Sequence, residues 1–170
     1  PYAPVRIGGH SAIWTGSKMV IWGGYAGSSD ASRQITAEGA IYNPADNTWV
    51  PTVTQGAPSA RAGHQAVWTG SKMVIISGGG VSSRTDLKST GGQYDLDTQT
   101  WTNYTSELMV ERVGHKAVWN GEEILIVGGR SNRLKTYFAE VYAYNPTTLR
   151  WRILSSSQTP RGRSNASIVW

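Results

Sequence analysis

One block of sequence recurs along this chain at a spacing of about fifty residues. The first copy starts at Gly9 and runs GHSAIWTGSKMVIWGG. The second starts at Gly63 as GHQAVWTGSKMVIISGG, and the third at Gly114 as GHKAVWNGEEILIVGG. The last residues, SIVW ending at Trp170, begin a fourth copy. A repeat of this period indicates one supersecondary unit used several times, with neighbouring units burying each other's apolar faces.

The composition favours strands over helices. Twenty Gly, eight Trp and eight Tyr stand against a single Phe, and no segment shows the 3.6-residue apolar period of an amphipathic helix. Residues 1–170 are long enough for one domain with a real core.

Each copy predicts four short strands. Continuous apolar runs at 19–22, 73–76 and 124–127 predict strands buried on both faces, which we expect to be innermost in each unit. The second strand ends in an Asn- or Asp-led turn, the third starts at a Trp that fills the gap between sheets, and the fourth follows Gly-His. The repeated structural residues are the glycine pairs Gly23, Gly24, Gly78, Gly79, Gly128 and Gly129 and the indoles Trp49, Trp101 and Trp151.

This order of strands predicts units at about 17–70, 71–120 and 121–170, with residues 9–15 as the outer strand of a preceding unit. Three units are too few to close a ring. We therefore expect either part of a longer ring, completed by further blades, or half of a ring assembled from two copies.

The order of paired glycines, Tyr, Trp and then Arg-x-Gly-His resembles the kelch repeat over nearly the whole chain. The sequence pattern HxAVWTGSKMVIWGG is similar to kelch repeats of bacterial secreted or surface proteins. The resemblance implies an all-β, kelch-type β-propeller of about three four-stranded blades plus one extra outer strand. It also implies a module that binds protein or carbohydrate at one end of the ring, without catalysis.

Two other functions stay open under the same resemblance. The chain is part of a propeller enzyme, galactose-oxidase-like or sialic-acid-epimerase-like, or it is a half-propeller that self-assembles into a six-bladed ring. Galactose oxidase needs a tyrosine cross-linked to a cysteine at its copper, and this chain has no cysteine. We expect no cofactor.

Arginines recur before the Gly-His step, at Arg6, Arg61, Arg112 and Arg163. Arginine grips carboxylates and sulfates with two hydrogen bonds, so a ring of these residues predicts ligand contact. The alternative is a structural role, with the guanidinium bonded to carbonyl oxygens.

Residues that do not repeat gather between the first and second strands of each unit, at 25–36, 80–90 and 130–137. Because the blade does not require them, they are better candidates for binding. They carry the cations Arg33, Arg84, Lys88, Arg130, Arg133 and Lys135. They predict a basic binding face, with solvated loops as the alternative.

Three histidines, His10, His64 and His115, recur once per unit, which favours a structural role over a metal site. The spacing of Asp95 and Asp97 lacks the later ligands of a calcium loop and predicts a turn.

The net charge of +5 favours an acidic partner, protein or glycan. No Lys/Arg run is long enough for a nucleic-acid patch, and no apolar stretch is long enough for a membrane span. No signal peptide opens this segment. The Ser- and Thr-rich, Lys-poor composition suggests an extracellular, cell-surface or periplasmic location.

Overall fold

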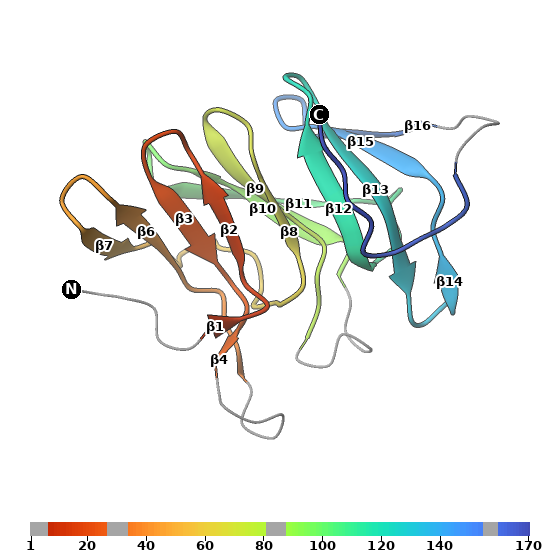
Figure 1. The fold of residues 1–170 in the computed structure, drawn as a ribbon, viewed down its shortest axis with the longest axis horizontal. Coiled ribbons are helices and arrows are strands. Elements are labelled where there is room, and N and C mark those ends of the chain that lie inside the picture. The colour runs from red at the N-terminus through yellow and green to blue at the C-terminus, as the bar shows by residue number, and fades with distance from the viewer. Residues whose placement is uncertain (1–6, 27–33, 81–87, 155–159) are drawn as a thin grey trace.

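A computed structural model describes residues 7–26, 34–80, 88–154 and 160–170 of the chain. Three antiparallel sheets, two of four strands and one of five, follow one another along the sequence and fan out side by side (Figure 1). No helix occurs among the described residues, so none of these segments could cross a bilayer as a helix. The all-β class predicted from the repeats is confirmed.

We call the three sheets blades 1, 2 and 3. Blade 1 contains β2 (Ser11–Trp14), β3 (Met19–Trp22), β6 (Gly39–Asn43) and β7 (Thr48–Pro51). Blade 2 contains β8 (Gln65–Trp68), β9 (Lys72–Ile76), β10 (Thr90–Asp95) and β11 (Thr100–Thr105). Blade 3 contains β12 (Val113–Trp119), β13 (Ile124–Ser131), β15 (Val141–Asn145) and β16 (Arg150–Leu154), and β14 (Thr136–Tyr137) pairs with the end of β13. A small sheet joins β1 (Ile7–Gly8), β4 (Tyr25–Ala26) and β5 (Gln34–Ile35).

The blade boundaries differ from those predicted. Strand β2 pairs antiparallel with β3, so that Ser11 lies opposite Trp22 and Trp14 opposite Met19. The reason is the tight turn between them, because a turn of this length joins neighbouring strands of one sheet. Residues 9–15 therefore begin blade 1 and are not the outer strand of a preceding blade. The three sheets span 11–51, 65–105 and 113–154.

The strand nearest the centre of the fan also differs from the prediction. Strand β8 contacts both β2 and β12 across the blades, and the three strands lie toward the middle of Figure 1. The apolar runs form the second strand of each sheet, with a neighbour on both sides. This central place explains their continuous apolar sequence, since Val20, Val74 and Ile126 have no exposed surface.

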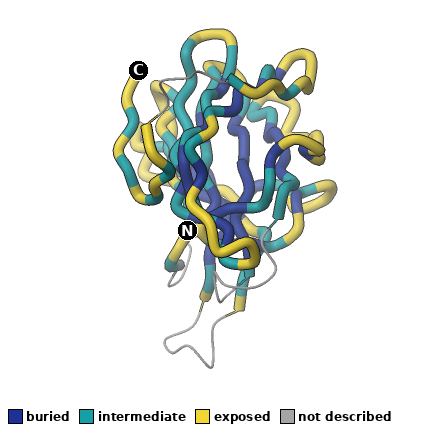
Figure 2. The backbone as a smooth tube through the Cα atoms, turned by 90° about the vertical axis from the view of Figure 1, so that its right-hand side faces the viewer, coloured by how far each residue is buried: buried dark blue, intermediate teal, exposed yellow. Residues whose placement is uncertain are grey.

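The core consists of two apolar clusters, one at each contact between neighbouring blades. Val20 and Trp22 of blade 1 pack with Met73, Ile75 and Tyr94 of blade 2. The second cluster joins blade 2 to blade 3 and contains Val74, Ile76, Tyr104, Ile124, Ile126 and Tyr144. Figure 2 shows the buried residues as a band through the middle of the molecule. Each fully buried side chain of this size contributes about 1.5–3 kcal/mol.

Backbone angles that recur at the end of the second strand show which residues correspond between blades. Gly23 and Gly24 have positive φ angles of 66° and 92°, and Gly128 and Gly129 have 67° and 92°. In blade 2 the same angles, 56° and 93°, belong to Ser77 and Gly78. The pair predicted at Gly78 and Gly79 is therefore shifted by one residue, because Ser77 takes the place of the first glycine.

Each end of the fan carries an exposed tryptophan. Trp68 and Trp119 pack against the clusters between blades, whereas Trp14 is 55% exposed and Trp170 is 77% exposed. These four residues hold the same place in successive copies of the repeat. The outer side of blade 1 is thus an open face of the type that lies buried inside the fan.

Candidate binding face

Arg61 is a structural group at the contact between blades 1 and 2. Its side chain is 1% exposed, and its Nε donates to the Ser59 carbonyl oxygen at 2.9 Å. One terminal nitrogen donates to the carbonyl oxygens of Ser77 and Thr90, at 3.0 and 2.6 Å. The other donates to the hydroxyls of Ser59 and Thr90. With all five donors engaged, this guanidinium has none left for a ligand.

Arg112 repeats this role in blade 3. It has no exposed surface and donates to the carbonyl oxygens of Val110 and Gly128, each at 3.0 Å. Its guanidinium carbon lies 4.0 Å from the centre of the Phe138 ring, a cation–π contact. Burial lowers the pKa of Arg112 from its ordinary value. The burial of Arg61 and Arg112 corrects the prediction that they contact a ligand.

Arg163 has the same local conformation but a different environment. Its Nε donates to the Arg161 carbonyl oxygen at 3.0 Å, as Arg61 and Arg112 donate two residues back. Unlike them it is exposed. Of the four predicted arginines it is the one that remains accessible in the described chain, since Arg6 lies outside the described residues.

The histidines differ in the same way. His64 is buried, and its Nε2 lies 2.8 Å from the Ser11 hydroxyl of the neighbouring blade. His115 is fully buried between blades 2 and 3, and His10 is exposed. Burial lowers the pKa of His64 and of His115 to about 3, and the nearby Arg61 and Arg112 add to the effect. Both rings are therefore neutral in the folded protein. Among the described residues no group of three or more His, Asp or Glu is placed to hold a metal ion.

The non-repeating cations lie at one end of the fan where they are described. Strand β14 and the small β1–β4–β5 sheet lie at the lower end of Figure 1, opposite the turns that join β2 to β3 and β12 to β13. Arg130, Arg133 and Lys135 belong to the β13–β14 hairpin at this end, and Lys88 is partly buried beside β10. Arg33 and Arg84 lie outside the described residues.

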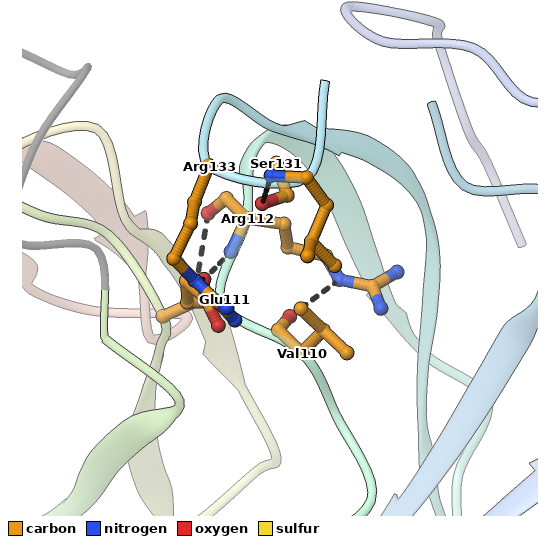
Figure 3. Close-up of polar contacts among 7 residues, drawn as sticks. Val110, Glu111, Arg112, Ser131 and Arg133 are labelled. Atoms are coloured by element: carbon orange, nitrogen blue, oxygen red, sulfur yellow. Dashed lines mark hydrogen bonds and ion pairs between the residues drawn. The ribbon is translucent and has the colours of Figure 1, made fainter. Parts of the chain in front are cut away.

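The β13–β14 hairpin extends blade 3 at this end. Strand β13 continues beyond its glycines, so that Arg130 pairs with Tyr137 and Ser131 with Thr136. Arg133 reaches back to Glu111, with 2.6 Å between its Nε and the carboxylate (Figure 3). The Ser131 hydroxyl accepts a hydrogen bond from the Leu134 amide and closes the turn. The ion pair with Arg133 lowers the pKa of Glu111.

Two residues of this hairpin were missed by the sequence reasoning, which considered its cations alone. Leu134 is 48% exposed and Tyr137 is 55% exposed, next to Lys135 at the tip. An exposed Leu and Tyr beside cations resemble the centre of a protein-binding surface, where Tyr and Arg are enriched. The signal in the sequence was that neither residue recurs in the other copies.

The chain matches the KLHDC2/KLHL20/DRC7 Kelch-repeats domain family over residues 2–170. It belongs to the Kelch-repeat family. The fold agrees, since this Kelch domain superposes on the solved structure of YjhT with a TM-score of 0.73 over 93% of the chain, at 16% sequence identity. The kelch-type propeller predicted from the repeats is thereby confirmed.

Relatives of this Kelch domain come from several kingdoms. It is 32% identical to acyl-CoA-binding domain-containing protein 4 of Arabidopsis thaliana, with 98% of the chain aligned. It is 28% identical to human Kelch domain-containing protein 3 over 84% of the chain. It is also 28% identical to N-acetylneuraminate epimerase of Pasteurella multocida over 55% of the chain. These relatives from a plant, a mammal and a bacterium do not support the bacterial secreted subgroup that the sequence pattern of the repeats suggested.

The aligned region is only part of each relative. The chain spans 24% of the plant protein, 37% of the human protein and 26% of the epimerase. It covers 54% of the YjhT chain.

Proposed function

We propose that this Kelch domain is a non-catalytic interaction module that binds a protein through the β13–β14 hairpin. The observation that carries the proposal is the exposed pair Leu134 and Tyr137 at a tip that also carries Lys135. Apolar and aromatic anchors supply most of the free energy of a protein interface, and cations at its rim select the partner.

The partner that fits is acidic. The chain has a net charge of +5. In the hairpin, Arg133 forms an ion pair with the carboxylate of Glu111. An acidic segment with an aliphatic or aromatic residue would match both the charge and the apolar tip. A sulfated or carboxylated glycan would match the charge but not the apolar side chains.

An array of peptides with graded acidic and apolar content, together with heparin fragments, tests the proposal. We expect the chain to prefer peptides that combine Asp or Glu with a large apolar residue. Tyr137→Ser and Lys135→Gln should each weaken that binding by about tenfold, or 1.4 kcal/mol. The matched control is Lys18→Gln, in the turn at the opposite end of blade 1. Equal loss in the control, or binding to heparin alone, would contradict the proposal.

An enzymatic role is the second candidate, because one relative is an N-acetylneuraminate epimerase. The assay is the rate at which the anomers of N-acetylneuraminate interconvert. We expect no acceleration by this chain. A rate above that of buffer, abolished by boiling the protein, would favour the enzyme.

Self-assembly is a third candidate, favoured by the open face of blade 1 that carries Trp14. The apolar side of blade 1 repeats the side of blade 2 that packs on its neighbour. A second copy of the chain would cover this face by the same type of contact that joins blades 1, 2 and 3.

A further inference from the structure

Each of the two contacts between blades contains a buried histidine. The ring of His64 packs edge-on against Trp22, with 5.2 Å between ring centroids. It also fills the space above Gly23, where an added Cβ would lie 2.7 Å from its Cε1 atom. His115 holds the same position in the repeat at the contact between blades 2 and 3 and has no exposed surface.

The segment 160–170 begins the next copy of this arrangement, and its backbone fixes the register. Asn165 has a φ of 56°, close to the 64° of Gly63 and the 66° of Gly114. Its amide donates to the Gly114 carbonyl oxygen at 2.7 Å, as Gly63 donates to Gly9 at 3.0 Å. Asn165 therefore corresponds to the glycine. Ala166, the next residue, stands where the other copies have histidine.

A methyl group in place of an imidazole leaves a cavity. The structure has a pocket of about 200 Å³ at this position, bounded by Ala166, Val127, Gly128 and Phe138. Above Gly128 the atoms nearest to an added Cβ belong to Arg163, and no ring takes the place that His64 has above Gly23. The apolar walls suit a flat or compact organic body.

The polar groups around this pocket are cationic. Lys116 lies opposite Val127 in β12, in the register that Ser11 has opposite Trp22, so an ammonium replaces the hydroxyl that bonds to His64. Arg161 and Arg163 also line the pocket, and its wall includes no carboxylate. Within the described part of the chain no ion pair engages these three side chains.

We propose that this pocket binds a small organic carboxylate. The body of the ligand would occupy the space of the missing imidazole, and its carboxylate would lie against Lys116 and Arg163. Cations beside an apolar floor together select a carboxylate that carries a ring or short chain over a free inorganic anion. This site is separate from the hairpin tip, so its success or failure does not depend on the proposed protein partner.

Calorimetric titration with sodium benzoate, and with the neutral benzamide, tests the site in the full chain. We expect saturable binding of one benzoate per chain and at least tenfold weaker binding of benzamide. Lys116→Gln should weaken benzoate binding at least tenfold. Ala166→His should abolish it, because this substitution restores the side chain with which the other copies fill the same space. Circular dichroism verifies that each variant is folded.

The control is Lys18→Gln, which removes one positive charge in the turn between β2 and β3 and should leave benzoate affinity unchanged. Three results would overturn the proposal: no saturable binding at millimolar benzoate, binding that survives Ala166→His in a folded protein, or equal weakening by Lys18→Gln and Lys116→Gln. The last result would indicate general attraction to a basic surface.

Discussion

At the scale of single residues, the buried arginines fasten the loop before each blade to the sheet that follows it. Arg112 joins Val110 and Gly128 through their carbonyl oxygens and stacks on Phe138. We predict that Arg112→Met lowers the free energy of unfolding by about 2–4 kcal/mol, because buried carbonyls lose their donor. Urea denaturation measures the effect.

The matched substitution is Arg152→Met, which removes an arginine paired with Glu123 at the surface, where its side chain is 57% exposed. That change should cost less than about 1 kcal/mol. Equal losses for the two arginines would show that burial does not distinguish them.

The buried histidines make stability depend on pH. The pKa of His64 and of His115 is about 3 in the fold, below the 6.5 of an unfolded chain. As the pH falls below 6.5 the unfolded chain takes up protons first, so the stability present at neutral pH is lost toward pH 3. Each histidine contributes up to about 1.4 kcal/mol per pH unit over this window.

Melting temperatures between pH 7.5 and 5 test this linkage. His115→Gln and His64→Gln should each make the decline with acid shallower. An identical decline in wild type and His115→Gln would assign the pH dependence to other groups.

At the scale of strands, Ser77 directly follows β9 and has the left-handed backbone that glycine has at the same place in blades 1 and 3. Its hydroxyl lies 2.8 Å from the Lys88 carbonyl oxygen and 3.0 Å from that of Arg112, and it accepts the Arg112 amide at 3.3 Å. We predict that Ser77→Ala costs about 1–2 kcal/mol, since the bonds are lost and the left-handed backbone stays.

Ser77→Gly should be nearly neutral, because relief of the backbone cost offsets the lost bonds. Urea denaturation of the two variants separates the cost of the lost hydrogen bonds from the cost of the left-handed backbone. A larger loss for glycine than for alanine would mean that backbone strain at Ser77 is small.

The strands could be predicted from the sequence, but the pairing partner of every strand could not. The apolar runs, the turns after β6 and β15, and the Trp that starts the third strand depend on local patterns, which the chain repeats. The error concerned which sheet β2 joins, although the Asn120–Gly121 turn before β13 already indicated paired strands. Burial of Arg61 and Arg112 could not be predicted, since it depends on carbonyl oxygens contributed by segments distant in sequence.

At the scale of the whole molecule, the open face of blade 1 should make the chain associate with itself. Trp14 is 55% exposed on a face whose counterparts are buried between blades. We predict a molar mass above that of one chain that rises with concentration, because exposed apolar surface of this kind drives association. Light scattering after gel filtration measures it.

Trp14→Lys should shift association to about tenfold higher concentration, or 1.4 kcal/mol. Tyr137→Ser, at the hairpin end, serves as the control and should not change the mass. A monomer at all concentrations would show that the open face of blade 1 does not drive association.

Each described blade is a sheet built from one stretch of the chain, 11–51, 65–105 or 113–154, and no strand is exchanged between neighbouring blades. A duplication or deletion of one repeat at the level of the gene would therefore leave the hydrogen-bonded sheets of the other blades intact. The change would need only a match between two side-chain surfaces, and these already resemble one another. Descendants of such a sequence can gain or lose blades in single genetic events, and the number of blades can drift faster than the blade itself.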